Sequence, residues 1–253
     1  MQIMHAYLGG RTRNVSMPPA DDEVLPGVLW GAFDELMTPA WWAGQCWQQD
    51  VLGRYADLKL GRNLTEELAA CLLGGFGMPA ELGLAAYSAV RAEGMLAVGS
   101  AVDALTLEAV LMRPLAYGDG YRSYRFPRQK ACYLAGCLKR LQNFCEPESD
   151  RGLRDALATF PGVGLKTASW VVRNYRGSHA VAVLDVHILR AGRHVGLFPR
   201  RWTPQSHYSA LESQFLAFAS AIKVRAGLLD AVMWDFMRRM PKTTVGVAQG
   251  ANA

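Results

Sequence analysis

The stretch that decides the fold is DALATFPGVGLKTASWVVRNY, residues 155–175. A helical pattern ends near Thr159, a turn follows at Pro161-Gly162-Val163-Gly164, and a second helical pattern begins at about Leu165. Glycine adopts backbone angles closed to other residues, and its missing side chain lets another backbone approach closely. We therefore predict two helices joined by a short hairpin over residues 153–175, although two glycines alone also suit an ordinary packing corner.

The start of the second helix is a candidate anion site. The first backbone N–H groups of a helix have no partner within it, and together with the helix dipole they attract negative charge. We expect the backbone N–H groups of Gly162, Val163 and Gly164 to hold a phosphate group.

Lys166 lies in the first turn of that second helix. A cation there is unfavourable with respect to the helix dipole, which favours the neutral amine, the nucleophilic form of lysine. The usual alternative is a solvated surface lysine, but Lys166 stands in a run of small and apolar residues, VGLKTA.

Asp185 follows Lys166 by nineteen residues and comes directly after the apolar run Val181–Leu184. An Asp at a predicted helix start can serve only as an N-cap, whose side chain accepts from the first N–H groups. It can also present a carboxylate to the lysine across a cleft, and the two roles are compatible.

Composition narrows the class of protein. The chain has 253 residues, 51% of them hydrophobic, and a net charge of +5, which excludes a disordered or fibrous protein. It has no apolar run long enough to span a membrane and no signal-peptide pattern at its start, so we expect a cytoplasmic protein. Basic residues cluster within 113–139 and 190–201, which suits either polyanion binding or a solvated charged face.

The five cysteines, Cys46, Cys71, Cys132, Cys137 and Cys145, form no CxxC pair and no zinc-type spacing. Their odd number suits a chain that keeps its thiols reduced. None follows Cys145.

The remaining pattern predicts an all-α fold. Helical stretches are predicted at residues 40–55, 65–73, 80–93, 102–112, 128–144, 150–159, 165–174, 185–195, 205–225 and 228–240. Strand patterns are nearly absent, and residues 114–127 are predicted to be a loop. We expect a loose segment at 1–24, one domain at 25–240 and a flexible tail at 241–253.

At PGVGLKTAS and LDVH the sequence resembles the helix-hairpin-helix superfamily of base-excision DNA glycosylases, over about residues 150–195. The resemblance implies two helical lobes that flank a DNA- and base-binding cleft, with a catalytic Asp loop at 176–190. It implies that Lys166 and Asp185 are catalytic, that a phosphate of double-stranded DNA binds the hairpin, and that a monovalent cation is shared by the turn carbonyls.

Within the superfamily, Lys at the position of Lys166 marks members that excise a base and then cleave the strand. Two branches carry both Lys and Asp: the endonuclease III branch and the 8-oxoguanine branch. The endonuclease III branch usually holds an iron–sulfur cluster on four C-terminal cysteines. This sequence has no cysteine after Cys145. We therefore expect no iron–sulfur cluster. We also expect no other cofactor and no metal ion in the chemistry. The protein is expected to be a monomer that binds double-stranded DNA with a damaged or modified base and does not bind a membrane.

The stretch LDAVMW, residues 229–234, is similar to a C-terminal helix of archaeal-type 8-oxoguanine glycosylases. The similarity implies that Trp234 stacks on the flipped base while Asp230 accepts from its N–H edge. A core Trp and a surface Asp are the alternative. On this basis 8-oxoguanine is the predicted substrate.

Two loops resemble those that fill the gap left by the flipped base. The loop with Tyr124, Arg125 and Phe126, followed by Arg128, resembles the wedge loop, and the turn with Phe76 resembles the neighbouring intercalating loop. Plain surface loops or buried aromatics are the alternatives. His187 is expected to contact a phosphate or to orient a neighbour.

The sequence thus predicts a bifunctional DNA glycosylase and lyase. Three alternatives stay open: a glycosylase for another modified base, a non-catalytic helix-hairpin-helix DNA-binding protein, and a helical interaction protein without nucleic acid. Housekeeping repair and a specialised role, such as defence, are not distinguished by sequence.

Overall fold

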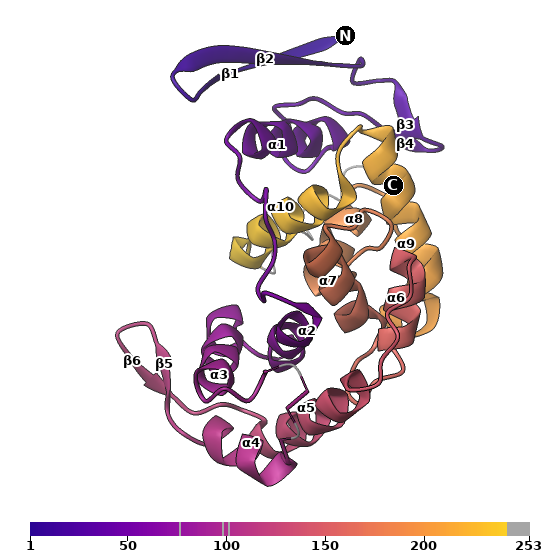
Figure 1. Ribbon diagram of the computed structural model, residues 1–253. Helices are drawn as coiled ribbons and strands as arrows, with labels where there is room; N and C mark the ends of the chain where they lie inside the picture. Colours follow the sequence, from indigo (N-terminus) through magenta and orange to yellow (C-terminus); the bar gives the residue numbers. More distant parts are fainter. Residues whose placement is uncertain (76, 98, 101, 242–253) are drawn as a thin grey trace. The chain divides into compact units, whose positions relative to one another are not determined.

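The computed structural model describes residues 1–75, 77–97, 99–100 and 102–241, and in these residues the fold is mostly helical (Figure 1). The helices are α1 (Pro39–Val51), α2 (Leu64–Leu73), α3 (Ala80–Ala92), α4 (Ala104–Leu111), α5 (Pro127–Leu141), α6 (Asp150–Leu157), α7 (Leu165–Arg176), α8 (Val186–His194), α9 (Pro204–Ala221) and α10 (Ala226–Arg239). The predicted all-α fold class is confirmed.

Three small two-stranded sheets accompany the helices. Their strands are β1 (Gln2–Leu8), β2 (Arg11–Met17), β3 (Glu23–Leu25), β4 (Val28–Leu29), β5 (Leu115–Tyr117) and β6 (Gly120–Arg122). The predicted loop at 114–127 therefore contains a short hairpin, β5–β6. The flexible tail predicted at 241–253 lies outside the described residues from residue 242 onward.

The chain divides into two compact units. The terminal unit comprises Met1–Asp57 and His179–Ala253, and the hairpin unit comprises Leu58–Ser178. The terminal unit contains β1–β4, α1 and α8–α10, and the hairpin unit contains α2–α7 with β5 and β6.

The prediction of a loose segment at 1–24 is wrong, because β1 and β2 pair as an antiparallel hairpin. The register runs from Gln2 opposite Met17 to Leu8 opposite Arg11. Gly9 and Gly10 form the turn with φ of 58° and 79°, the left-handed angles that a type I′ turn needs at both positions. This glycine pair between two extended runs was the hairpin signal, and the polar composition of the segment obscured it.

In the terminal unit, α1 is the helix around which the aromatic residues gather. Thr38 caps α1 by accepting from the Trp41 backbone N–H at 3.0 Å. Trp42 is fully buried, and the ring of Trp41 meets that of Phe236 edge-on at 4.7 Å between centroids. Helix α1 packs on α10, and α10 packs on α8.

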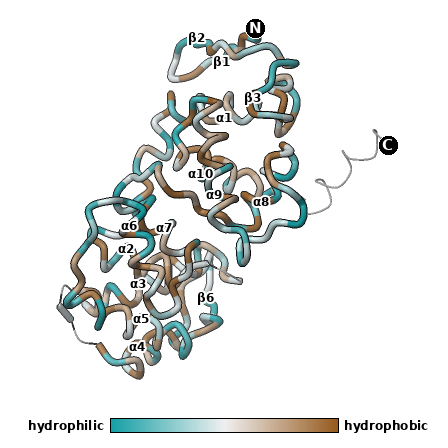
Figure 2. Tube along the Cα trace, turned by 90° about the vertical axis from the view of Figure 1, so that its right-hand side faces the viewer, coloured by the Kyte–Doolittle hydropathy of each residue, from teal (hydrophilic) through white to brown (hydrophobic). Residues whose placement is uncertain are grey.

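In the hairpin unit, α2 is the central helix and packs against α3, α5 and α7. Its Leu68, Leu72 and Leu73 are fully buried, and apolar positions recur along the helices (Figure 2). Glu67 is also fully buried. Its carboxyl group accepts from the backbone N–H groups of Leu60 and Gly61 at 2.9 and 2.8 Å and from Asn174 Nδ2 at 2.8 Å, so a buried, hydrogen-bonded side chain joins α2 and α7.

Candidate active site

The turn between α6 and α7 uses its two glycines differently. Gly162 has a φ of +71°, and an added Cβ there would run into the ring of Tyr133 on α5. Gly164, the N-cap of α7, has an ordinary φ of −94° and nothing within 4 Å of an added Cβ. The fold therefore requires glycine at position 162. At position 164 an added Cβ would meet no other atom within 4 Å, so glycine is not required there by the packing.

The start of α7 is held by the backbone alone. No side chain caps it. The N–H of Val163 donates to the Phe160 carbonyl at 3.1 Å, so that N–H is used inside the turn. Of the three N–H groups predicted to hold a phosphate, that of Val163 is thus engaged within the turn, and phosphate binding by those of Gly162 and Gly164 stays a prediction.

Lys166 lies in this first turn and is half-buried. Its ammonium nitrogen stands 6.0 Å from the centroid of the Trp170 ring, one helical turn further on. Sequence reasoning missed Trp170, although the i, i+4 spacing places it on the same helix face as Lys166.

A second lysine of the hairpin unit, Lys130 on α5, interacts electrostatically with Lys166. Its Nζ donates to the carbonyl of Leu72 at 2.5 Å and reaches that of Gly74 at 3.5 Å. Burial, and secondarily the charge of Lys166, lowers the pKa of Lys130. The sequence offered Lys130 only as one member of a basic cluster.

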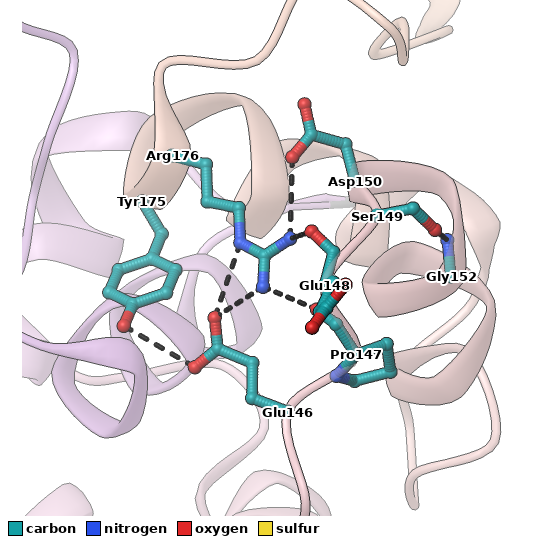
Figure 3. Close-up of polar contacts among 8 residues, drawn as sticks. All are labelled: Glu146, Pro147, Glu148, Ser149, Asp150, Gly152, Tyr175 and Arg176. Carbon is teal, nitrogen blue, oxygen red and sulfur yellow. Dashed lines mark hydrogen bonds and ion pairs between the residues drawn. The ribbon is translucent and has the colours of Figure 1, made fainter.

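The C-terminal end of α7 is fixed by Arg176, at the centre of the contacts in Figure 3. Its guanidinium donates to Glu146 Oε1 at 2.6 Å and to the Glu148 carbonyl at 2.7 Å, and it pairs with Asp150 Oδ1 at 3.4 Å. Tyr175 donates to Glu146 Oε2 at 3.4 Å. Because residues 146–150 lead into α6, Arg176 binds the beginning of one hairpin helix to the end of the other.

The two predicted wedge loops lie together in the hairpin unit. Arg125 Nη1 donates to the Gly77 carbonyl at 3.3 Å, and its guanidinium lies 5.0 Å from the Phe126 ring centroid. Tyr124 is buried, and its hydroxyl donates to the Leu73 carbonyl at 2.5 Å, so its prediction as a wedge is wrong. Arg125 and Arg128 are exposed and Phe126 is half-buried, whereas Phe76 lies outside the described residues.

Asp185, in the terminal unit, is the N-cap of α8. Its Oδ1 accepts from the backbone N–H groups of His187 and Ile188 at 2.8 and 3.0 Å. The capping role left open by the sequence is therefore present. The side chain is half-buried, and a carboxylate has further acceptor capacity beyond these two bonds.

Asp230 and Trp234 stand one turn apart on α10, as their spacing predicts. Asp230 is buried, with 2% of its surface exposed, which excludes a surface Asp. Trp234 is half-buried, and the Arg238 guanidinium lies 4.7 Å from its ring centroid. The His187 ring meets Trp234 edge-on at 6.4 Å, and His187 Nδ1 is buried without a hydrogen-bond partner among the described residues.

The predicted site residues therefore fall into two sets. The hairpin unit carries Lys166, the glycine turn and the wedge loops, and the terminal unit carries Asp185, His187, Asp230 and Trp234. In the part of the chain that the structure describes, no three His, Cys, Asp or Glu side chains group to hold a metal ion. Within the same residues, no helix is long and apolar enough to cross a membrane.

A family model described as 8-oxoguanine DNA glycosylase matches residues 54–224. The 8-oxoguanine DNA glycosylase/AP lyase of Metallosphaera sedula is 33% identical over 117 residues, which are 44% of this chain and 57% of that protein. A protein of the same name from Saccharolobus islandicus is 29% identical over 121 residues, 44% of this chain and 58% of that one. The aligned part thus spans less than two thirds of these relatives.

Two solved structures share the fold. The 8-oxoguanine DNA glycosylase of Thermotoga maritima superimposes with a TM-score of 0.53 at 24% identity, over 68% of this chain and 78% of that one. The Methanocaldococcus jannaschii 8-oxoguanine glycosylase/lyase, solved in complex with DNA containing 8-oxoguanine, gives a TM-score of 0.53 at 22% identity, over 68% of this chain and 79% of that one.

Proposed function

Because the chain belongs to the 8-oxoguanine DNA glycosylase family, we propose that it removes 8-oxoguanine from double-stranded DNA and then cleaves the strand at the abasic sugar. The observation that carries this proposal is the position of Lys166. It stands in the first turn of α7, directly after a glycine turn that leaves the helix start open. An amine at that place can attack the sugar of a nucleotide whose phosphate is held by the same turn.

The proposed reaction proceeds through a Schiff base. The amine nitrogen of Lys166 attacks C1′ as the bond from C1′ to the base breaks, and the base leaves with the bonding electrons and takes up a proton from water. Asp185 stabilises the positive charge that develops on the sugar and accepts a proton from the attacking amine. The sugar ring opens to an iminium ion. Loss of a C2′ proton then breaks the C3′–O bond, and water releases Lys166.

Recognition of the base is assigned to the terminal unit. A glycosylase must extrude its target nucleotide from the stack. We propose that Trp234 stacks on the extruded base and that Asp230 accepts from its N–H edge. Arg125 and Phe126 are assigned to the gap that the base leaves in the duplex.

Phosphate binding is assigned to the glycine turn, with Arg128 and His187 as further contacts. A monovalent cation shared by carbonyl groups of the turn fits this proposal. Proton transfer and amine addition are steps that Lys166 and Asp185 can perform without a metal ion or an iron–sulfur cluster.

The decisive experiment is borohydride trapping on a duplex with 8-oxoguanine opposite cytosine. Borohydride reduces the iminium to a stable amine, so the wild-type protein should become covalently attached to DNA. We expect no adduct from Lys166→Gln and a normal adduct from Lys139→Gln, a matched change at an exposed lysine of α5. Normal trapping by Lys166→Gln would refute the assigned nucleophile.

A panel of duplexes tests the substrate. Adducts only with an oxidised pyrimidine or another modified base would replace 8-oxoguanine as the substrate and leave the chemistry intact. Binding to DNA without any adduct would favour a non-catalytic DNA-binding protein, and no binding at low salt would favour a protein without a nucleic-acid partner.

A further inference from the structure

The β1–β2 hairpin, residues Gln2–Met17, forms a two-stranded ribbon with one anchored face and one open face. We call it the N-terminal ribbon. It lies alongside α1 (Figures 1 and 2). Gln2 fastens its base by donating to the carbonyls of Pro18 and Gly31, both at 2.9 Å, and by accepting from the Phe33 N–H at 3.0 Å. The ribbon is therefore a fixed part of the terminal unit.

The open face of the ribbon is polar over most of its length. Three cross-strand pairs share it, and all six residues are exposed: Ile3 with Ser16, His5 with Asn14, and Tyr7 with Thr12. Five of these six side chains can donate or accept a hydrogen bond. Tyr7, near the tip, is 75% exposed.

The charged side chains of the ribbon, those of two arginines, are all positive. Residues 1–20 contain Arg11 and Arg13 and no Asp or Glu. Both arginines are exposed and lie beside the turn, opposite Ala6 and Leu8, so their side chains project from the face that does not carry the polar row. Among the described residues, neither has an ion-pair partner. Two exposed cations without ion-pair partners on one face of the tip, with Tyr7 and Thr12 on the other face, match a polyanion at the tip, because phosphate oxygens accept from Arg, Thr and Tyr alike.

We propose that the tip of the N-terminal ribbon is a second DNA-contacting surface, which binds the sugar–phosphate backbone of the duplex through Arg11 and Arg13 on one face and Tyr7 and Thr12 on the other. This inference rests on the proposed function, since it adds a contact to the same DNA. A two-stranded ribbon has the width to lie in the major groove. The ribbon lies outside the matched residues 54–224, so the family match does not assign it a role.

Two features favour DNA over a second copy of the chain as the partner. Two ribbons that both carry Arg11 and Arg13 repel each other, whereas each attracts phosphate. The ribbon is also connected to the proposed catalytic machinery, because it packs on α1, α1 packs on α10, and α10 packs on α8, which begins at Asp185. A contact made by the ribbon thereby helps to orient that machinery on the duplex.

The test compares wild type with the double variant Arg11→Gln/Arg13→Gln. Dissociation constants for a duplex with 8-oxoguanine opposite cytosine are measured by fluorescence anisotropy over a series of salt concentrations. We expect about tenfold weaker binding, and a slope of log K against log salt that is shallower by about 1 to 2, since each lost phosphate contact removes about 0.9.

The matched control is Lys223→Gln, which removes an exposed cation of the same unit near the end of α9, and it should keep the wild-type slope. Shortening the duplex by about one helical turn (~10 bp) on each side should weaken wild-type binding and leave the double variant little changed. Thermal unfolding of both variants should match wild type, because the substituted side chains are exposed.

The outcomes separate the two proposals. A wild-type protein that neither binds nor traps DNA refutes the proposed function. A wild-type protein that binds and traps, with unchanged affinity and salt slope in the double variant, refutes the ribbon contact alone. Unchanged DNA binding combined with loss of a wild-type dimer in sedimentation would assign the ribbon to self-association and equally overturn the proposal.

Discussion

Two helices of this protein, α7 and α8, begin in opposite ways, and each carries one of the two proposed catalytic residues. Helix α7 follows Gly164, an N-cap without a side chain, so no side chain caps its first N–H groups. Helix α8 begins at Asp185, whose carboxylate occupies the equivalent N–H groups of its own helix. An open start attracts an outside anion, and a filled start holds an anion that belongs to the protein.

The difference is consistent with the positions of the proposed nucleophile and the proposed catalytic carboxylate. At α7 the anion is proposed to come from the substrate, and Lys166 is next to it. At α8 the anion is Asp185 itself, held in one orientation by the N–H groups of His187 and Ile188. In the proposed reaction, the start of α7 thus binds the substrate phosphate and the start of α8 holds the carboxylate of Asp185.

The largest effect should come from removing the charge at α8 while keeping its cap. In Asp185→Asn the amide oxygen still accepts from the helix, so we expect the free energy of unfolding to change by a few tenths of a kcal/mol. Single-turnover excision should fall by about 100- to 1000-fold, because the positive sugar loses its counter-charge. Asp185→Ala should lose the same activity and about 1 kcal/mol of stability. Wild-type excision by the Asn variant would leave Asp185 as a cap only.

The next largest effect is a difference in stability between substitutions at Gly162 and at Gly164, the two glycines of the turn before α7. Gly162→Ser should cost about 2–4 kcal/mol of unfolding free energy, because it strains a positive φ and forces a side chain into Tyr133. Gly164→Ser should change stability by less than about 0.5 kcal/mol, since Ser is a good N-cap. Urea unfolding of both variants measures the difference, and equal losses would contradict the distinct roles.

A smaller effect should follow from making the start of α7 resemble that of α8. Gly164→Asp places a carboxylate where a phosphate is proposed to bind, and its Cβ meets nothing within 4 Å. We expect the fold to be retained and DNA affinity to fall about tenfold, which is about 1.4 kcal/mol. The isosteric control is Gly164→Asn, which should lose less. If both variants bind DNA as wild type does, the phosphate is not held there.

The smallest effect concerns a third helix start, that of α2, where Asn63 is the cap and Glu66 lies in the first turn. Hydrogen bonds from Arg62 lower the pKa of Glu66 from 4.5 to about 2. A carboxyl with a lowered folded-state pKa stabilises the protein above its unfolded pKa, and that stability is lost as the pH falls through the folded value.

The melting temperature of wild type should therefore fall by a few degrees more than that of Glu66→Gln between pH 5 and pH 2, around the pKa values of 4.5 and about 2. Differential scanning at several pH values measures this. Parallel curves for the two proteins would mean that the ion pair contributes nothing.

The helical fold and the hairpin were predictable because their signals are local. The turn at Pro161–Gly164 is indicated by its proline and two glycines, and the helix after it is indicated by the periodicity of its apolar residues. The i, i+4 spacing of Asp230 and Trp234 likewise placed both on one helix. The N-terminal ribbon was not predicted, because the Gly and polar residues of this segment are also typical of an irregular terminus, and only the Gly9-Gly10 turn marks the hairpin.

The supporting residues of the site were not predictable, because their contacts join distant parts of the chain. Lys130 binds carbonyls at Leu72 and Gly74, and buried Glu67 bonds to Asn174. No local pattern marks such partners. For Tyr124 the sequence left a wedge and a buried aromatic as alternatives, and only the distant contact of its hydroxyl with the Leu73 carbonyl distinguishes them.

The division of the chain also dictates an order of assembly on the ribosome. The hairpin unit is one continuous segment, Leu58–Ser178, whereas the terminal unit is completed only after synthesis passes residue 179. Helix α1 must wait for α10, to which it is joined by the Asp50–Arg225 ion pair at 2.5 Å and by the Trp41–Phe236 contact. Until then its aromatic face has no partner, and the nascent chain carries an exposed Trp-rich surface of the kind that chaperones bind.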